Sequence, residues 1–314
     1  VLQRGYYMEN SDFMKKVEEF LKDKKFESIE EANKALWEFI DILNNAPLEE
    51  FCGLSPNKMM KILNFPFDSP DVVSFNMNII PPLDAPFVKI FILLINGLYK
   101  TGGIKATCKG NLPRNFCREI ENSFLSEEDF KFSLRDKFPI MKEQDSLDIH
   151  RVRIIAEMAG YIRKYRNKFI LTKKGEKIIT DGFTIDDYLN LFKTFTIKIN
   201  WAYFDLFEDI DIIQGSFLFT LYLLQNFGEK FKPKRFYADK FFTAFEHALR
   251  TDLQGVEFPF SIEEEVKEAY IFRAIDKFAI FWGFAETPEK SYYKGFFYKD
   301  VKKTDFLDKF IKFY

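Results

Sequence analysis

A short pattern that occurs three times constrains the fold more than any other feature of this chain. In each copy a strand-like stretch ends at a threonine, and a new helix is expected to follow; the copies centre on Thr107, Thr172 and, less closely, Thr304. Each copy comes after an apolar, helix-like run. Because internal repetition reports a repeated structural unit, the sequence predicts tandem helical units, each closed by a small β-hairpin.

The second copy gives the clearest prediction of local structure. Gly160 is expected to end a helix. Residues 161–164 and 169–171 have the composition of two strands, and Asn167 in the turn between them tolerates the positive φ that tight hairpin turns require. Thr172 is expected to cap the next helix. A helix followed by a hairpin, or wing, and a further helix is the outline of a winged helix.

The whole chain is predicted to be mainly α-helical with small β-hairpins. Capping boxes at Ser28 and Ser261 begin two amphipathic helices. Forty phenylalanines fall mostly at helical spacing within apolar faces, so we expect them to pack in the core. The predicted organisation is an N-terminal helical segment followed by tandem winged-helix-like units, with bounds at residues 8–54, 55–125, 126–198 and 199–314.

Composition excludes several classes of protein. The 314 residues carry 46 Lys and Arg against 48 Asp and Glu, a formal charge of -2, so any nucleic-acid binding must be local. Three cysteines form no CxxC pair, which argues against a disulfide framework or zinc site and favours a reducing compartment. No signal peptide or membrane-spanning run is visible. We therefore expect a cytoplasmic protein with no cofactor, no bound metal and no membrane partner.

The strongest indication of function is a local concentration of positive charge. Residues 151–177 contain nine basic and two acidic residues, a balance of +7. In a winged helix the helix before the wing enters the major groove and the wing contacts phosphates or the minor groove, so this placement favours nucleic-acid contact. The candidate contact residues lie on the helix, on the wing and just after it: His150, Arg151, Arg153, Arg163, Lys164, Arg166, Lys168, Lys173 and Lys174.

Two other charged segments have a structural interpretation. Residues 100–118 carry five basic residues and no acidic one, but they lack the spacing of a P-loop, and we expect a turn in which Asn111 caps a helix. An acidic group lies just before a predicted buried helix, and acidic residues are favoured there by the positive N-terminal end of the helix dipole. The spacing of these acidic residues is not that of an EF-hand calcium loop. This group is Asp205, Glu208, Asp209 and Asp211.

No catalytic signature accompanies these segments. The only histidines are His150 and His247, and no serine or cysteine has the sequence context of an activated nucleophile. Cys108 lies beside Lys109 without an identifiable base, so we interpret it as an ordinary small residue. The sequence therefore favours a protein that is not an enzyme.

Three segments resemble the patterns of an uncharacterised bacterial family. Residues 53–59 (GLSPNKM) are similar to its GLSPxQM segment, except that Lys58 stands where the family has Gln. Residues 105–114 (KATCKGNLPR) and 200–205 (NWAYFD) resemble its KxTxKGNLP and NWxYxD segments. The family is related to SEC-C proteins and to plasmid pRiA4b ORF-3-like proteins. The resemblance implies no activity, and without a cysteine-rich SEC-C motif it implies no zinc-dependent role.

Together these observations favour a non-enzymatic binding protein. Its first candidate partner is nucleic acid, preferably DNA, contacted by the basic wing of residues 126–198. The alternative is a protein-interaction scaffold in which the wings pack against one another. A third hypothesis, from another class, is a metal-dependent nuclease that uses the acidic group.

Overall fold

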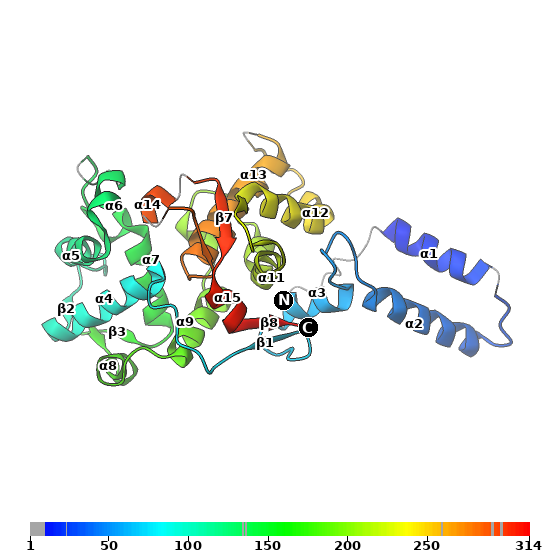
Figure 1. The fold of residues 1–314 in the computed structure, drawn as a ribbon, viewed down its shortest axis with the longest axis horizontal. Coiled ribbons are helices and arrows are strands. Elements are labelled where there is room, and N and C mark those ends of the chain that lie inside the picture. The colour runs from blue at the N-terminus through cyan, green and yellow to red at the C-terminus, as the bar shows by residue number, and fades with distance from the viewer. Residues whose placement is uncertain are drawn as a thin grey trace.

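The computed structural model describes residues 10–22, 24–133, 135, 137–258, 260–289, 292–295 and 298–314. Within them the protein is mainly helical with small antiparallel sheets, as predicted. Figure 1 shows a helical body and an arm of two helices that projects from one end of it. The arm consists of α1 (Asn10–Lys22) and α2 (Ile29–Asn45), and α3 (Pro56–Asn64) links it to the body. Residues 8 and 9 of the predicted N-terminal segment lie outside the described residues.

The first of two similar units runs from α4 to α8. Its three strands form one antiparallel sheet in the order β2-β4-β3. The predicted boundary at residue 125 is therefore corrected, because β2 pairs with β4 and the segments 55–125 and 126–198 share this sheet. In chain order the elements are α4 (Pro86–Thr101), β2 (Ile104–Lys105), α5 (Arg114–Phe124), α6 (Glu127–Phe132), the short helix η1 (Glu143–Asp145), α7 (Leu147–Met158), β3 (Ile162–Tyr165), β4 (Lys168–Leu171) and α8 (Lys173–Thr180).

The second unit has a similar order of helices and strands, with fewer helices between its first two strands and a short helix between its last two. Its strands follow the order β5-β7-β6, which is the same arrangement of first, third and second strand. Its elements are α11 (Phe217–Phe227), β5 (Lys232–Pro233), α12 (Lys234–Asp252), α13 (Ile262–Tyr270), the π-helix η3 (Ile271–Ile280), β6 (Ala285–Glu286), α14 (Tyr292–Gly295), β7 (Asp300–Lys303) and α15 (Asp305–Phe310). Among the described residues, strand pairing thus forms two repeated units rather than three.

Two of the three threonines close these units in the same way. Thr172 donates its hydroxyl proton to the carbonyl of Gly160 at 2.7 Å, and Thr304 does the same to Gly283 at 2.7 Å. Both glycines end the preceding helix with positive φ. Thr107 differs, because it closes a tight loop with Asn111 instead of beginning a helix. The expected helix cap at Asn111 is corrected as well, since α5 begins after Pro113.

Helix α9 (Ile185–Lys198) lies between the two units: it packs against α7 of the first unit, and its aromatic side chains pack against the second, in line with the predicted core role of phenylalanine. Phe192 contacts the rings of Phe217 and Trp282, and the Tyr188 hydroxyl donates to the Trp282 carbonyl at 2.7 Å. Beyond α9 lie η2 (Trp201–Phe204) and α10 (Asp211–Gly215). Near the C-terminus, β8 (Ile311–Phe313) pairs with β1 (Val73–Phe75). Within the described residues, no helix has both the length and the apolarity needed to cross a bilayer.

Candidate nucleic-acid interface

The β3-β4 hairpin of the first unit has the tight turn that the sequence predicts. Arg166 and Asn167 occupy its two central positions with φ values of 46° and 58°. Positive φ at both positions defines a type I′ turn, whose twist matches that of the flanking strands. The hairpin is anchored by Phe169, which is fully buried and pairs with β2 on one side and β3 on the other. The wing is therefore a regular hairpin that is held firmly in the sheet.

Strand register sorts the wing side chains onto two faces. Residues directly opposite each other in a sheet share a face, so buried Phe169 marks the inner face. The next residues in register mark the outer face: Tyr165 lies opposite Lys168, and Lys168 lies opposite Lys105. Arg163 shares this outer face, two residues before Tyr165 on β3. We use the term basic platform for five exposed residues of this face and the adjoining turn: Lys105, Arg163, Tyr165, Arg166 and Lys168.

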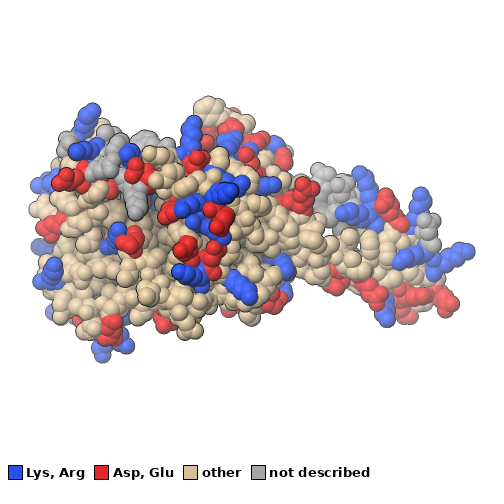
Figure 2. Space-filling view, in the orientation of Figure 1, with Lys and Arg blue, Asp and Glu red and all other residues tan. Residues whose placement is uncertain are grey.

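The sheet joins two basic segments that lie far apart in the sequence. Lys105 belongs to residues 100–118, and Lys168 belongs to the wing. The Lys164 ammonium donates to the carbonyl of Gly110 at 2.7 Å, so the wing also contacts the loop after β2. Figure 2 shows Lys and Arg side chains in blue at the end of the molecule where Figure 1 labels β2. The earlier structural interpretation of residues 100–118 missed this juxtaposition.

The charges of the basic platform are not neutralised by nearby acids. In the described part of the chain, none of its four cations forms an ion pair with a carboxylate. Arg163 and Arg166 instead lie 5.4 and 5.2 Å from the centre of the Tyr165 ring. Like charges directly opposite each other in a sheet are destabilising, so the pairing of Lys105 with Lys168 reduces stability. A surface that keeps this repulsion is suited to an anionic ligand.

The basic residues predicted on the helix before the wing do not form a surface. His150, Arg151 and Arg153 are buried on α7, with relative exposures of 9% or less. The Arg151 guanidinium donates to Asp148 at 2.8 Å and lies 4.8 Å from the ring centre of Phe204. The prediction that these three side chains contact nucleic acid from the helix is therefore corrected, because other parts of the chain cover α7 and bind their polar groups.

Glu143 is the acid that holds two of these side chains. It has no exposed surface, and one carboxylate oxygen lies 2.6 Å from His150 Nδ1 and 2.9 Å from Arg153 Nε. Its other oxygen accepts the backbone N–H of Leu112 at 2.5 Å. Burial raises the pKa of Glu143, but the His150 hydrogen bond, the Arg153 charge and the Leu112 N–H together lower it below its ordinary value. Glu143 thus fixes the loop after β2 to α7.

The lowered pKa of Glu143 predicts a loss of stability in acid. A carboxyl group whose pKa is lower in the folded state stabilises the fold above its unfolded pKa of 4.5, and this contribution is lost as the pH falls through the folded value. Denaturant titrations at pH 7 and below 4.5 should therefore show a larger drop in unfolding free energy for the wild type than for Glu143→Gln. Equal drops in the two proteins would contradict the prediction.

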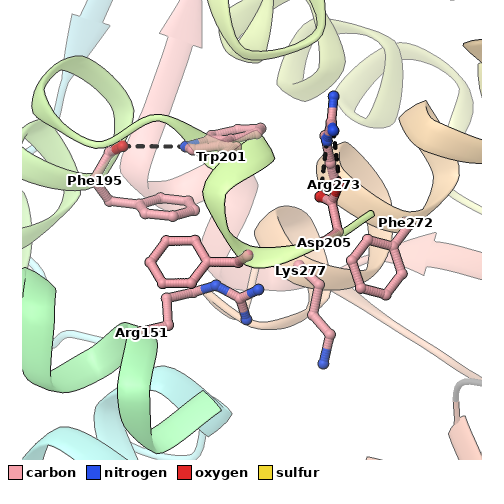
Figure 3. Close-up of a pocket in the computed structure, with 8 residues that line it drawn as sticks. Arg151, Phe195, Trp201, Asp205, Phe272, Arg273 and Lys277 are labelled. Carbon is pink, nitrogen blue, oxygen red and sulfur yellow. Dashed lines mark hydrogen bonds and ion pairs between the residues drawn. The ribbon is translucent and has the colours of Figure 1, made fainter. Parts of the chain in front are cut away.

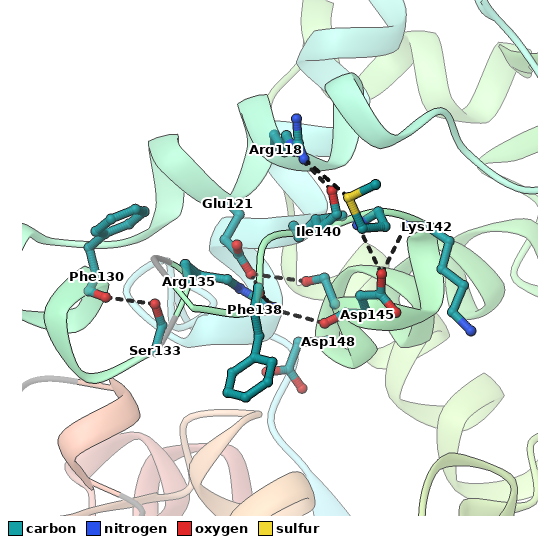
Figure 4. Close-up of polar contacts among 12 residues, drawn as sticks. Arg118, Glu121, Phe130, Ser133, Arg135, Phe138, Ile140, Lys142, Asp145 and Asp148 are labelled. Atoms are coloured by element: carbon teal, nitrogen blue, oxygen red, sulfur yellow. Dashed lines mark hydrogen bonds and ion pairs between the residues drawn. The ribbon is translucent and has the colours of Figure 1, made fainter.

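A second polar network fixes residues 138–146, the segment that contains Glu143 (Figure 4). Arg135 donates to the carboxylate of Glu121 at 2.7 Å and to the carbonyl of Asp145 at 3.1 Å. Arg118 Nε donates to the carbonyl of Ile140 at 2.9 Å. Since Glu121 and Arg118 both lie on α5, these contacts bind residues 138–146 to that helix. The buried position of Glu143 is therefore supported from both sides.

A small cavity lies where η2 and η3 cover α7 (Figure 3). The Asp205 carboxylate receives two hydrogen bonds from Arg273, at 2.6 and 2.8 Å. Lys277 donates to Asp148 at 3.1 Å. Burial lowers the pKa of Lys277. The Lys277–Asp148 pair connects the two units at α7, and the Arg273–Asp205 pair binds the segment after η2 to the second unit. The cavity is lined by Arg151, Phe195, Trp201, Phe204, Asp205, Phe272, Arg273 and Lys277.

The remaining predicted residues are divided between surface and interior. Lys173 is exposed at the start of α8. Lys174 is half-buried over the ring of Tyr161, at 4.2 Å, and burial lowers its pKa. In the acidic group, Asp205 is occupied by Arg273, and Asp209 accepts a hydrogen bond from Asn200 at 2.8 Å. Throughout the described ranges, no three His, Cys, Asp or Glu side chains are grouped to hold a metal ion.

Two residues of the candidate interface are absent from the contact residues that the sequence predicts. Lys105 belonged to a segment interpreted as structural, although the absence of acids from residues 100–118 was a usable signal. Tyr165 was treated only as part of a turn. An aromatic residue flanked by Arg163, Lys164 and Arg166 was the signal for it, since aromatic side chains interleaved with basic ones are typical of nucleic-acid surfaces.

Comparison with known proteins identifies similarity over the first unit. The family model for the Y4jL N-terminal domain matches residues 84–183, about a third of the chain. The matched span begins just before α4 and ends just after α8, so it coincides with the unit that carries the basic platform. The chain has no significant match among curated proteins or solved structures. The resemblance to SEC-C and pRiA4b ORF-3-like proteins stays a prediction.

Proposed function

We propose that the protein is a non-enzymatic nucleic-acid-binding protein and that the basic platform is its contact surface. The observation that carries the proposal is the pairing of β2 with β4, which joins two acid-free basic segments on one exposed face. Exposed lysines and arginines that form no ion pair on such a face are suited to bind phosphates. The platform has four cations, so it matches a short stretch of nucleic-acid backbone.

We further propose that both repeated units are winged helices, over residues 86–180 and 217–310. In both units a helix and a strand are followed by at least two helices and then by two further strands, and the third strand is central in the sheet, which supports this assignment. The wing of the first unit is the more basic one, because residues 161–171 carry four basic residues and no acidic one, whereas residues 285–303 carry three acidic residues among their lysines. When the units are aligned on Thr172 and Thr304, Asp300 of the second wing takes the place of Lys168. The proposed interface therefore belongs to the first unit alone.

Burial of α7 shapes the proposed mode of binding. A winged helix that reads sequence places the helix before the wing in the major groove. Since the basic side chains of α7 are buried, we propose that the wing sheet contacts phosphates without this groove-reading step. Such contacts position a protein on nucleic acid but carry no sequence information. The proposed binding is accordingly independent of base sequence.

A salt series with duplex DNA of random sequence tests this proposal. Four phosphate contacts predict that the logarithm of the binding constant falls with the logarithm of salt concentration with a slope of roughly -3 to -4. The double variant Arg163→Glu/Arg166→Glu should lose most of the affinity. Fluorescence anisotropy at several salt concentrations measures both effects. An absence of binding by the wild type at low salt would overturn the proposal.

One observation favours the second candidate, a protein-interaction scaffold. In both units the helix before the wing, α7 or α13 with η3, has many buried side chains and contacts the rest of the chain. In the scaffold hypothesis this helix serves for packing within the protein, and the winged-helix units are structural modules that do not bind DNA. The same salt series separates the candidates, because a scaffold predicts no salt-dependent DNA binding at any ionic strength.

A further inference from the structure

The platform carries an aromatic side chain that phosphate binding alone does not require. Tyr165 lies at the end of β3, immediately before the wing turn, and 49% of its surface is exposed. It stands on the outer face, directly opposite Lys168. The buried ring of Phe169 and the ladder on both sides of β4 hold the strand beneath it. The ring is therefore presented to solvent from a rigid support.

The groups around Tyr165 match the parts of a nucleotide. Arg163 and Arg166 place their guanidinium carbons 5.4 and 5.2 Å from the ring centre, and Lys168 and Lys105 continue the same row across the sheet. An aromatic ring stacks on the face of any base, and neighbouring arginines add stacking and charge. Lysines in the adjoining row are placed for the phosphates on either side of such a base.

Whether the Tyr165 ring can stack on a base depends on whether the nucleic acid is a continuous duplex or has exposed bases. In an uninterrupted duplex each base face is covered by its neighbours, so a wing on the outside meets only backbone and groove edges. Base faces are exposed at duplex ends and in single-stranded segments. With α7 buried, no basic helix side chain competes for the role of base contact in this unit.

We propose that Tyr165 stacks on an exposed nucleobase, so that the basic platform binds nucleic-acid ends and single-stranded overhangs more tightly than continuous duplex. This inference rests on the proposed function, because it assigns the base contact of the same surface. The ligand is the face of an unpaired or terminal base together with its flanking phosphates. Lys105 and Lys168 supply charge, and the ring supplies the preference for an open end.

The test compares three DNAs at one salt concentration: a covalently closed circle, a blunt duplex and the same duplex with a short 3′ overhang. Wild-type protein should bind the overhang roughly tenfold more tightly than the circle, the effect typical of one base stacked on an aromatic ring. Comparison of the blunt duplex with the overhang shows whether the ligand is a terminal base pair or an unpaired base. Tyr165→Ala should abolish the preference, so that the variant binds the overhang no more tightly than it binds the circle.

Tyr165→Phe is the matched control, because it keeps the ring and should keep the preference. Equal affinity of the wild type for circle and overhang would overturn the inference while leaving phosphate binding intact. A preference that survives in Tyr165→Ala would overturn it as well. If no DNA is bound at low salt, the proposed function and this inference both fail, so the two failures are distinguishable.

Discussion

Glu143→Ala is expected to lower the free energy of unfolding by about 3–5 kcal/mol, the typical cost of removing one partner from a buried ion pair. The substitution leaves the buried Arg153 guanidinium without its main counter-charge and removes the acceptors of His150 and the Leu112 N–H. Each polar group left unpaired in the interior adds a desolvation cost. Urea denaturation followed by circular dichroism measures the effect.

Glu157→Gln is the matched control for this prediction. Glu157 contacts the other end of the same Arg153 guanidinium at 2.9 Å, but 31% of its side chain is exposed. Solvent screening makes such a pair worth less, so a loss of about 1 kcal/mol or below is expected. Similar losses in the two variants would show that Glu143 contributes no more than a surface carboxylate, contrary to the prediction.

A double variant separates charge from packing at this site. Replacing Glu143 and Arg153 together with leucine and methionine removes both buried charges and leaves only the partly exposed Glu157 without its partner. Buried ion pairs replaced by apolar residues of similar volume often lose little stability. The double variant should therefore be more stable than Glu143→Ala. A double variant as unstable as the single one would assign the loss to the hydrogen bonds of Leu112 and His150 instead.

Local signals in the sequence predicted local structure well. Gly160, the Arg166-Asn167 turn and Thr172 were each identifiable because helix stops, type I′ turns and caps depend on residues close in the chain. The pairing of β2 with β4 was not, because nothing within a two-residue strand specifies a partner more than sixty residues away. The number of units, and with it the composition of the interface, depended on that pairing.

The burial of the α7 cations shows why charge counts alone misplace a site. Arg151 and Arg153 contributed to the local balance of +7, yet each contacts an acid at helical spacing, Asp148 or Glu157. Those spacings are present in the sequence and indicate intrahelical pairs. The contact with Glu143 is not readable in this way, since it depends on how residues 138–146 fold back. Lys105 and Lys168, which have no such partner, form the exposed surface instead.

Lys168→Glu is expected to change binding and stability in opposite directions. It replaces a proposed phosphate-binding cation with an anion, so DNA affinity at low salt should fall roughly 10- to 100-fold, and the salt slope should become shallower by about 1. At the same time it places a carboxylate directly opposite Lys105. An opposite-charge pair at that position should stabilise the fold by about 0.2–1 kcal/mol.

Lys302→Glu on the second wing is the control, and its expected effects on stability and on DNA binding differ from those of Lys168→Glu. Lys302 lies opposite Glu286 and pairs with it at 2.9 Å, so the substitution should destabilise the fold and leave DNA binding unchanged. Fluorescence anisotropy with DNA and thermal unfolding, measured on both variants, distinguish a platform that serves only the structure from one that binds a ligand. A platform kept only for structure would lose nothing when Lys168 becomes Glu, because the fold gains an ion pair. A stabilised variant that no longer binds would mean that the Lys105-Lys168 repulsion is retained for its ligand.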